Sequence, residues 1–131
     1  MVKAERFLPD TCAWIDFFNA RHTPLATALE QLLLQGEVFT CGIVKYELVQ
    51  GVRSQAEEKT LLHAFQAVNH LEMNESLWIK AGRLSAALRK KGVTIPFSDI
   101  LIAVLALEND LTILTVDRHF EQVEGVKAKA G

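Results

Sequence analysis

The sequence predicts an α/β protein, a three-layer α/β/α sandwich around a short central parallel sheet, on two observations. Short segments rich in β-branched and aromatic residues alternate with longer segments whose apolar residues recur at helical spacing. Between Ile95 and Asp117, an apolar run over residues 100–107 predicts a helix buried on nearly every side, and the Thr-, Ile- and Val-rich segment after it predicts a buried strand. Strands separated by helices form a parallel sheet with right-handed crossovers.

Length and composition indicate one domain over residues 1–131, since a chain of 131 residues with 50% hydrophobic composition can bury a substantial core. The net charge of -2 means that a phosphate-rich partner needs a local basic patch or a bound cation.

The two cysteines lack metal-site spacing. Residues 1–6 carry no apolar segment of a signal peptide, and the longest apolar run is far shorter than the roughly 20 residues that span a bilayer. We therefore expect a cytoplasmic protein.

Capping residues, chain breakers and apolar spacing place the helices. They are predicted at residues 11–18, 25–34, 42–51, 55–66, 75–91 and 96–109. Strands are predicted at residues 7–10, 37–40, 111–116 and 125–128, and residues 68–72 are either a connector or a short strand. Thr11 is expected to cap the first helix, and Pro96 and Ser98 to start the last. Pro9 limits the pairing of the first strand.

Four acids fall where this fold places its functional edge, beyond the carboxyl ends of the strands. Asp10 and Asp117 follow strands, Asp99 lies in the first turn of the buried helix, and Glu47 lies early in a helix that follows a strand. Singly, each has an ordinary explanation: a favourable helix dipole for Asp99, turn formation for Asp10 and Asp117, and solvation for Glu47. Together, they are expected to converge.

Carboxylates crowded into a partly dry cleft repel one another, and a divalent cation removes that penalty. The pattern shows oxygen ligands without His or Cys, which favours Mg²⁺ or Mn²⁺ over zinc. Such an ion lowers the pKa of a bound water and neutralises charge on a phosphoryl group. The chemistry that the acids imply is therefore hydrolysis of a phosphodiester.

Four motifs carry a resemblance to a known family. They are Leu8-Pro9-Asp10-Thr11 with Trp14-Ile15, Tyr46-Glu47-Leu48 with Gly51, Phe97-Ser98-Asp99-Ile100-Leu101-Ile102-Ala103, and Leu114-Thr115-Val116-Asp117 with Phe120. In this order they resemble a PIN domain, specifically a ribonuclease toxin of the VapC type from a bacterial toxin–antitoxin pair. Pro9 departs from the aliphatic residue usual before the first acid, and Val44 stands where many relatives carry a hydroxyl residue.

The resemblance implies a metal-dependent endoribonuclease that forms a homodimer and is blocked by a small antitoxin protein. It assigns catalysis and the metal to an acidic quartet, in which Asp117 is the most variable member and acts directly or through water. That quartet is Asp10, Glu47, Asp99 and Asp117. It also implies that Thr11, Thr115 and Ser98 support these carboxylates.

Other residues have two interpretations each. Lys45 and Arg118, close in sequence to the acids, are candidates for binding the RNA phosphates. His119 is either a phosphate donor or general acid, or a surface histidine in a turn. The basic residues over 80–91 either guide RNA or a partner, or form a solvated helix end. The aromatic residues Trp14, Phe17, Phe18 and Trp78 either stack on bases or belong to the core or a dimer interface.

Two other enzyme classes with acids at a sheet edge do not fit. A receiver domain needs an acceptor Asp after a central strand, but no Asp lies between Asp16 and Asp99. A haloacid-dehalogenase-type phosphatase needs Asp-x-Asp after the first strand, where this chain reads Asp10-Thr11-Cys12. The alternative that remains is a catalytically silent PIN-fold module that binds RNA or protein. The presence of all four acids favours the nuclease.

Overall fold

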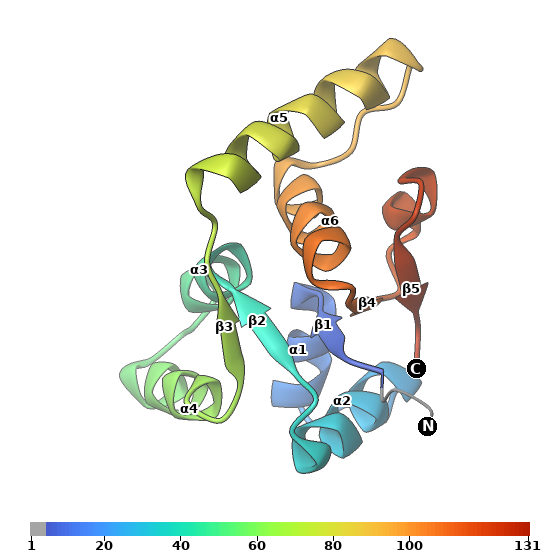
Figure 1. The fold of residues 1–131 in the computed structure, drawn as a ribbon. Coiled ribbons are helices and arrows are strands. Elements are labelled where there is room, and N and C mark those ends of the chain that lie inside the picture. Colours follow the sequence, from blue (N-terminus) through green and yellow to red (C-terminus); the bar gives the residue numbers. More distant parts are fainter. Residues whose placement is uncertain (1–4) are drawn as a thin grey trace.

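Short parallel strands lie at the centre of the computed structural model, which describes residues 5–131 (Figure 1). The strands are β1 (Phe7–Pro9), β2 (Phe39–Cys41), β3 (Asn69–Leu71), β4 (Thr112–Leu114) and β5 (Lys127–Lys129). The helices are α1 (Thr11–Phe18), α2 (Pro24–Gln35), α3 (Gly42–Gln50), α4 (Gln55–Phe65), α5 (Glu75–Lys90), α6 (Phe97–Asn109) and the 3-10 helix η1 (Arg118–Gln122). The predicted α/β class with a short parallel sheet is confirmed.

The strands form two paired groups, β1-β4-β5 and β2-β3, that meet at Phe7. The N–H of Phe7 donates to the carbonyl of Glu37 beside β2 at 3.0 Å, whereas the N–H of Asp10 donates to a β4 carbonyl at 2.9 Å. Because successive residues of a strand point their N–H groups to opposite sides, Pro9 faces β2 and has no N–H to offer. This explains why the described ladder between the two groups is a single bridge from Phe7 to Val38, just before β2, as the position of Pro9 predicted.

The helix starts follow the capping rules in most places. Thr23 caps α2 by accepting the N–H of Ala26 at 3.0 Å, and α2 ends at Gly36 in the left-handed conformation with φ 72. Helix α6 begins at Phe97, between Pro96 and Ser98, the two residues predicted to mark its start; Pro96 is the N-cap residue, and no side chain makes a capping hydrogen bond. The fixed φ of Pro96 and its missing N–H suit that place.

Helix α6 provides much of the core. All residues from Ile100 to Ala106 are buried, as the apolar run predicted, and the helix packs against α3, α5 and β4. Figure 1 shows α5 and α6 on one side of the strands and α1 and α2 packed together on the other. This burial holds the first turn of α6 rigidly next to the ends of the strands.

The remaining differences from the predicted elements are small. Residues 68–72 contain the strand β3, and the last strand lies one to two residues later than expected, at Lys127–Lys129. No helix in residues 5–131 is both long and apolar enough to cross a bilayer. Residues 1–4, on which the expectation about a signal peptide partly rests, lie outside the described residues.

Candidate active site

The four predicted acids belong to elements that start or end at one edge of the sheet. Asp10 follows β1, Asp117 follows β4, and Glu47 lies on α3, which begins directly after β2. Asp99 lies in the first turn of α6. Asp10 and Asp99 are each only 6% exposed, so their charges are largely removed from water.

Hydrogen bonds connect Glu47 to Asp10 through Thr11. The carboxylate of Asp10 caps α1 by accepting the backbone N–H of Thr11 at 2.7 Å, so the prediction that Thr11 itself is the cap is wrong. The hydroxyl of Thr11 is thereby free to donate to Oε1 of Glu47 at 2.6 Å. Thr11 thus donates hydrogen bonds to two of the acids, and the supporting role that the resemblance gives it stays a prediction.

Thr115 connects Asp10 to Asp117 in the same way. Its hydroxyl donates to Oδ2 of Asp10 at 3.0 Å and accepts the backbone N–H of Asp117 at 2.9 Å. Asp117 in turn caps η1 by accepting the backbone N–H of His119 on Oδ1 at 2.9 Å. One continuous chain of hydrogen bonds therefore runs from Glu47 to His119.

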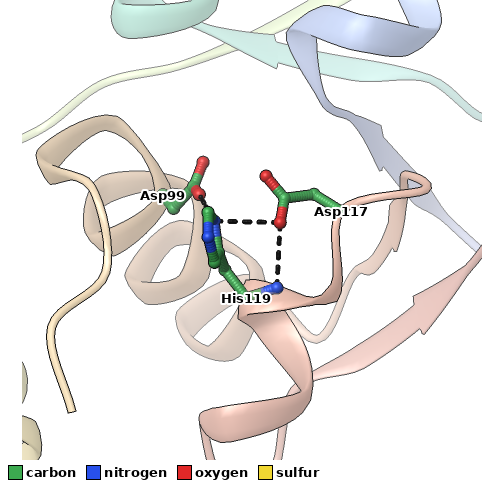
Figure 2. Close-up of side chains that lie close together, drawn as sticks. All are labelled: Asp99, Asp117 and His119. Atoms are coloured by element: carbon green, nitrogen blue, oxygen red, sulfur yellow. Dashed lines mark hydrogen bonds and ion pairs between the residues drawn. The ribbon is translucent and has the colours of Figure 1, made fainter.

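His119 joins the fourth acid, Asp99, to this chain (Figure 2). Its Nδ1 lies 2.9 Å from Oδ2 of Asp99 and 2.9 Å from Oδ1 of Asp117. One ligand atom from each of these three residues lies within 4.8 Å of the other two. His119 is thus not an isolated surface histidine. The signal that could have located it is the Asx-type turn after Asp117, which folds residue 119 back onto the carboxylate.

The electrostatics of the site show an excess of negative charge. Burial raises the pKa of Asp99 to about 6 against the hydrogen bond from His119, and the charges of Asp10 and Asp117 add to the rise. Burial also raises the pKa of Asp10, against the hydrogen bonds from Thr11 and Thr115. The hydrogen bond to Asp99 raises the pKa of His119. A divalent cation fits this site because it would compensate the carboxylates.

Comparison with known proteins places this geometry in a family. The family model for the PIN domain matches residues 7–126. The chain belongs to the PIN domain family. Ribonuclease VapC21 of Mycobacterium tuberculosis (strain H37Rv) is 26% identical over 124 residues, which cover 92% of this chain and 88% of the relative. Ribonuclease VapC11 of the same strain is 25% identical over 120 residues, which cover 88% and 90%.

Solved structures confirm the fold of this PIN domain. VapBC2 from Rickettsia felis, bound to a DNA fragment from its promoter, gives a TM-score of 0.78 at 18% identity over 94% of this chain and 96% of that one. VapBC-1 from nontypeable Haemophilus influenzae gives a TM-score of 0.77 at 22% identity over the same shares, 94% and 96%. At these identities the likeness concerns the fold alone.

Three predicted residues do not join the acids of the PIN domain within residues 5–131. The Nζ of Lys45 lies 5.5 Å above the ring of Phe65, and Arg118 is an exposed side chain 3.5 Å from Glu121. The hydroxyl of Ser98 caps no helix. Their roles in binding phosphate or supporting carboxylates stay predictions. The sequence analysis did not place Cys12 at the site. In the structure its Sγ lies 3.6 Å from Oδ2 of Asp10.

Proposed function

We propose that this PIN domain is a divalent-metal-dependent endoribonuclease, the toxin of a type II toxin–antitoxin pair. The observation that carries the proposal is the single hydrogen-bonded network that holds four carboxylates at one edge of the sheet, Asp10, Glu47, Asp99 and Asp117. The names of the relatives support the RNA substrate, since VapC21 and VapC11 are called ribonucleases.

Each part of the network has a task in this chemistry. The four carboxylates would hold Mg²⁺ or Mn²⁺, and such an ion supplies an activated water and neutralises charge on the phosphate. Thr11 and Thr115 aim carboxylate oxygens by donating hydrogen bonds to Glu47 and Asp10. Asp99 would hold the ion from the first turn of α6, where the residue is only 6% exposed.

The test is cleavage of a mixed RNA substrate by purified Asp10→Asn and Asp99→Asn variants. Each substitution keeps the size of the side chain and removes one negative charge, so we expect cleavage to fall by roughly 100-fold or more. EDTA should abolish cleavage by the unaltered protein, and added Mn²⁺ should restore it. Asp110→Asn is the matched control, because Asp110 lies at the opposite, exposed end of α6 and pairs with Lys127.

The outcome separates the nuclease from the catalytically silent module. Full cleavage by Asp99→Asn, or cleavage that persists in EDTA, contradicts metal-dependent catalysis by this site. A protein that binds RNA without cutting it, in Mg²⁺ and in Mn²⁺, is the silent module. Mapping of the new RNA ends after brief expression identifies the target in the same experiment.

We propose further that a small antitoxin protein inhibits this chain, that two copies form a homodimer, and that the enzyme acts in the cytoplasm. Support for the antitoxin comes from the VapBC complexes of Rickettsia felis and Haemophilus influenzae, with which this chain shares its fold. A cavity of about 500 Å³ between α1, α3 and α4 is lined in part by Glu47, so an occupant of this cavity would contact one of the four acids.

A further inference from the structure

We propose that Nδ1 of His119 is a ligand of the catalytic metal together with carboxylate oxygens of Asp99 and Asp117, and that this nitrogen makes the site prefer Mn²⁺ to Mg²⁺. The inference rests on the proposed function, because it concerns the ion that this function requires. It replaces the oxygen-only ligand set that the sequence indicated with a mixed set of one nitrogen and several oxygens.

The distances within the cluster suit a shared ion (Figure 2). Neighbouring ligands of an octahedral ion with bonds of about 2.1 Å lie about 3.0 Å apart. Nδ1 of His119 lies 2.9 Å from Oδ2 of Asp99 and 2.9 Å from Oδ1 of Asp117. Each pair therefore has the spacing of adjacent ligands, and small shifts would allow all three atoms to face one ion.

The fold holds the imidazole at this position. The backbone N–H of His119 donates to Asp117 at 2.9 Å, and the next residue, Phe120, is only 1% exposed in the core. Helix η1 also packs against α6, which carries Asp99. Within residues 5–131, the hydrogen-bond and ion-pair partners of Nδ1 are the two carboxylates. The backbone and the core thus hold this nitrogen beside both acids.

Access to the site comes from the side of His119. Its side chain is 44% exposed and that of Asp117 is 31% exposed, whereas that of Asp99 is 8% exposed. A hydrated ion can therefore reach His119 and Asp117 from solvent and exchange water for the buried carboxylate of Asp99. The cluster is open on the side that holds the nitrogen ligand.

The nitrogen ligand changes which ion binds best. Mg²⁺ prefers oxygen ligands and keeps several waters, whereas imidazole increases the affinity of transition-metal ions. If His119 only oriented Asp99 by a hydrogen bond, its loss would weaken both ions alike. If it is a ligand, its loss weakens Mn²⁺ more than Mg²⁺. The ratio of the two affinities separates these roles.

The experiment measures binding of Mn²⁺ and of Mg²⁺ by calorimetry to the full chain and to His119→Gln. We expect the Kd for Mn²⁺ to rise about tenfold or more, with a clearly smaller change for Mg²⁺. Electron paramagnetic resonance of the Mn²⁺-loaded protein should show ¹⁴N coupling from a bound imidazole, absent in His119→Gln. His70→Gln is the control, because His70 lies on the edge strand β3, outside the cluster. Its Nε2 lies 3.2 Å from a carboxylate oxygen of Glu72.

Failure of this inference and failure of the proposed function give different results. Mn²⁺ bound without ¹⁴N coupling, or an equal loss of both ions in His119→Gln, overturns the role of His119 and leaves the carboxylate site intact. No binding of either ion to the unaltered protein overturns both. His119→Asn provides a second variant, and matching thermal melts in EDTA show whether either variant alters the fold.

Discussion

The hydroxyl of Thr115 donates to Asp10, accepts the backbone N–H of Asp117 and lies 3.7 Å from the Sγ of Cys12, and the residue is only 4% exposed. Thr115→Val keeps the shape and removes the hydroxyl. The carboxylate and the N–H then lose a partner, which costs roughly 1–3 kcal/mol of stability. We expect that decrease in urea unfolding and slower RNA cleavage at equal folded fraction. Thr115→Ser, which retains the hydroxyl, should cleave faster than Thr115→Val; the opposite order contradicts the assigned role.

The acids also set the pH dependence of stability. The pKa of Asp99 is raised to about 6, and those of Asp10 and His119 are raised as well. The folded protein therefore binds more protons than the unfolded chain between about pH 4 and 7, and its free energy of unfolding falls as the pH rises through that range. In EDTA, we expect a higher melting temperature at pH 5 than at pH 7.5.

Asp99→Asn tests this explanation because it removes the buried charge. In EDTA at pH 7.5, its melting temperature should lie a few degrees above that of the unaltered protein, and the difference should shrink towards pH 5. Mn²⁺ should stabilise the unaltered protein more at pH 7.5 than at pH 5, because protons compete for the carboxylates. A melting temperature that increases from pH 5 to pH 7.5 in EDTA would show that these shifts do not control stability.

At the residue scale, the sequence predicted the acids better than their neighbours. Asp10 and Asp117 follow strands and Asp99 opens a helix, so the order of elements alone brought them to one edge. His119 depends instead on a local turn, in which its N–H returns to Asp117. Thr11 was misassigned as a cap because the helix begins one residue earlier than expected, with Asp10 as the N-cap residue and Thr11 as the first helical residue.

Helix α6 links the core to the site, since it carries Asp99 at its start. Ile102, in its middle, is fully buried at 0% exposure, whereas Leu107 is 41% exposed. Ile102→Ala should reduce the free energy of unfolding by about 2–5 kcal/mol, because it removes buried methyl groups and leaves a cavity. Leu107→Ala should cost about 0.5 kcal/mol or less. Urea denaturation measures both, and similar losses would contradict the packing of α6 described above.

At the scale of elements, the helices could be predicted because apolar spacing and capping act within one segment. The strands were predicted longer than the structure has them, with residues 111–116 reduced to β4, Thr112–Leu114. A strand exists only where a partner strand pairs with it, and single segments do not contain that information. The strand β3 resembled a connector because Asn69 and His70 are exposed on an edge strand.

At the scale of the whole molecule, one face carries exposed apolar side chains from three helices. We call it the Trp78 face, and it comprises Tyr46, Trp78 and Phe97, which are 63%, 47% and 63% exposed. The rings of Trp78 and Phe97 stack with centroids 6.2 Å apart. Tyr46, Trp78 and Phe97 line a cavity of about 410 Å³. Exposed apolar patches of this kind mark protein interfaces, so we expect the homodimer to form here.

A dimer through the Trp78 face would have twice the 14.6 kDa mass of the chain in light scattering. Trp78→Glu places a charge within the apolar contact, where its desolvation is uncompensated, so we expect this variant to elute as a monomer. Leu34→Glu is the matched control, because Leu34 is 85% exposed on α2 and lies outside this face. It should remain a dimer, and far-UV circular dichroism should show the same helix content in all three proteins. Dissociation by Leu34→Glu with a dimeric Trp78→Glu would place the interface elsewhere, and a monomeric unaltered chain would contradict the dimer itself.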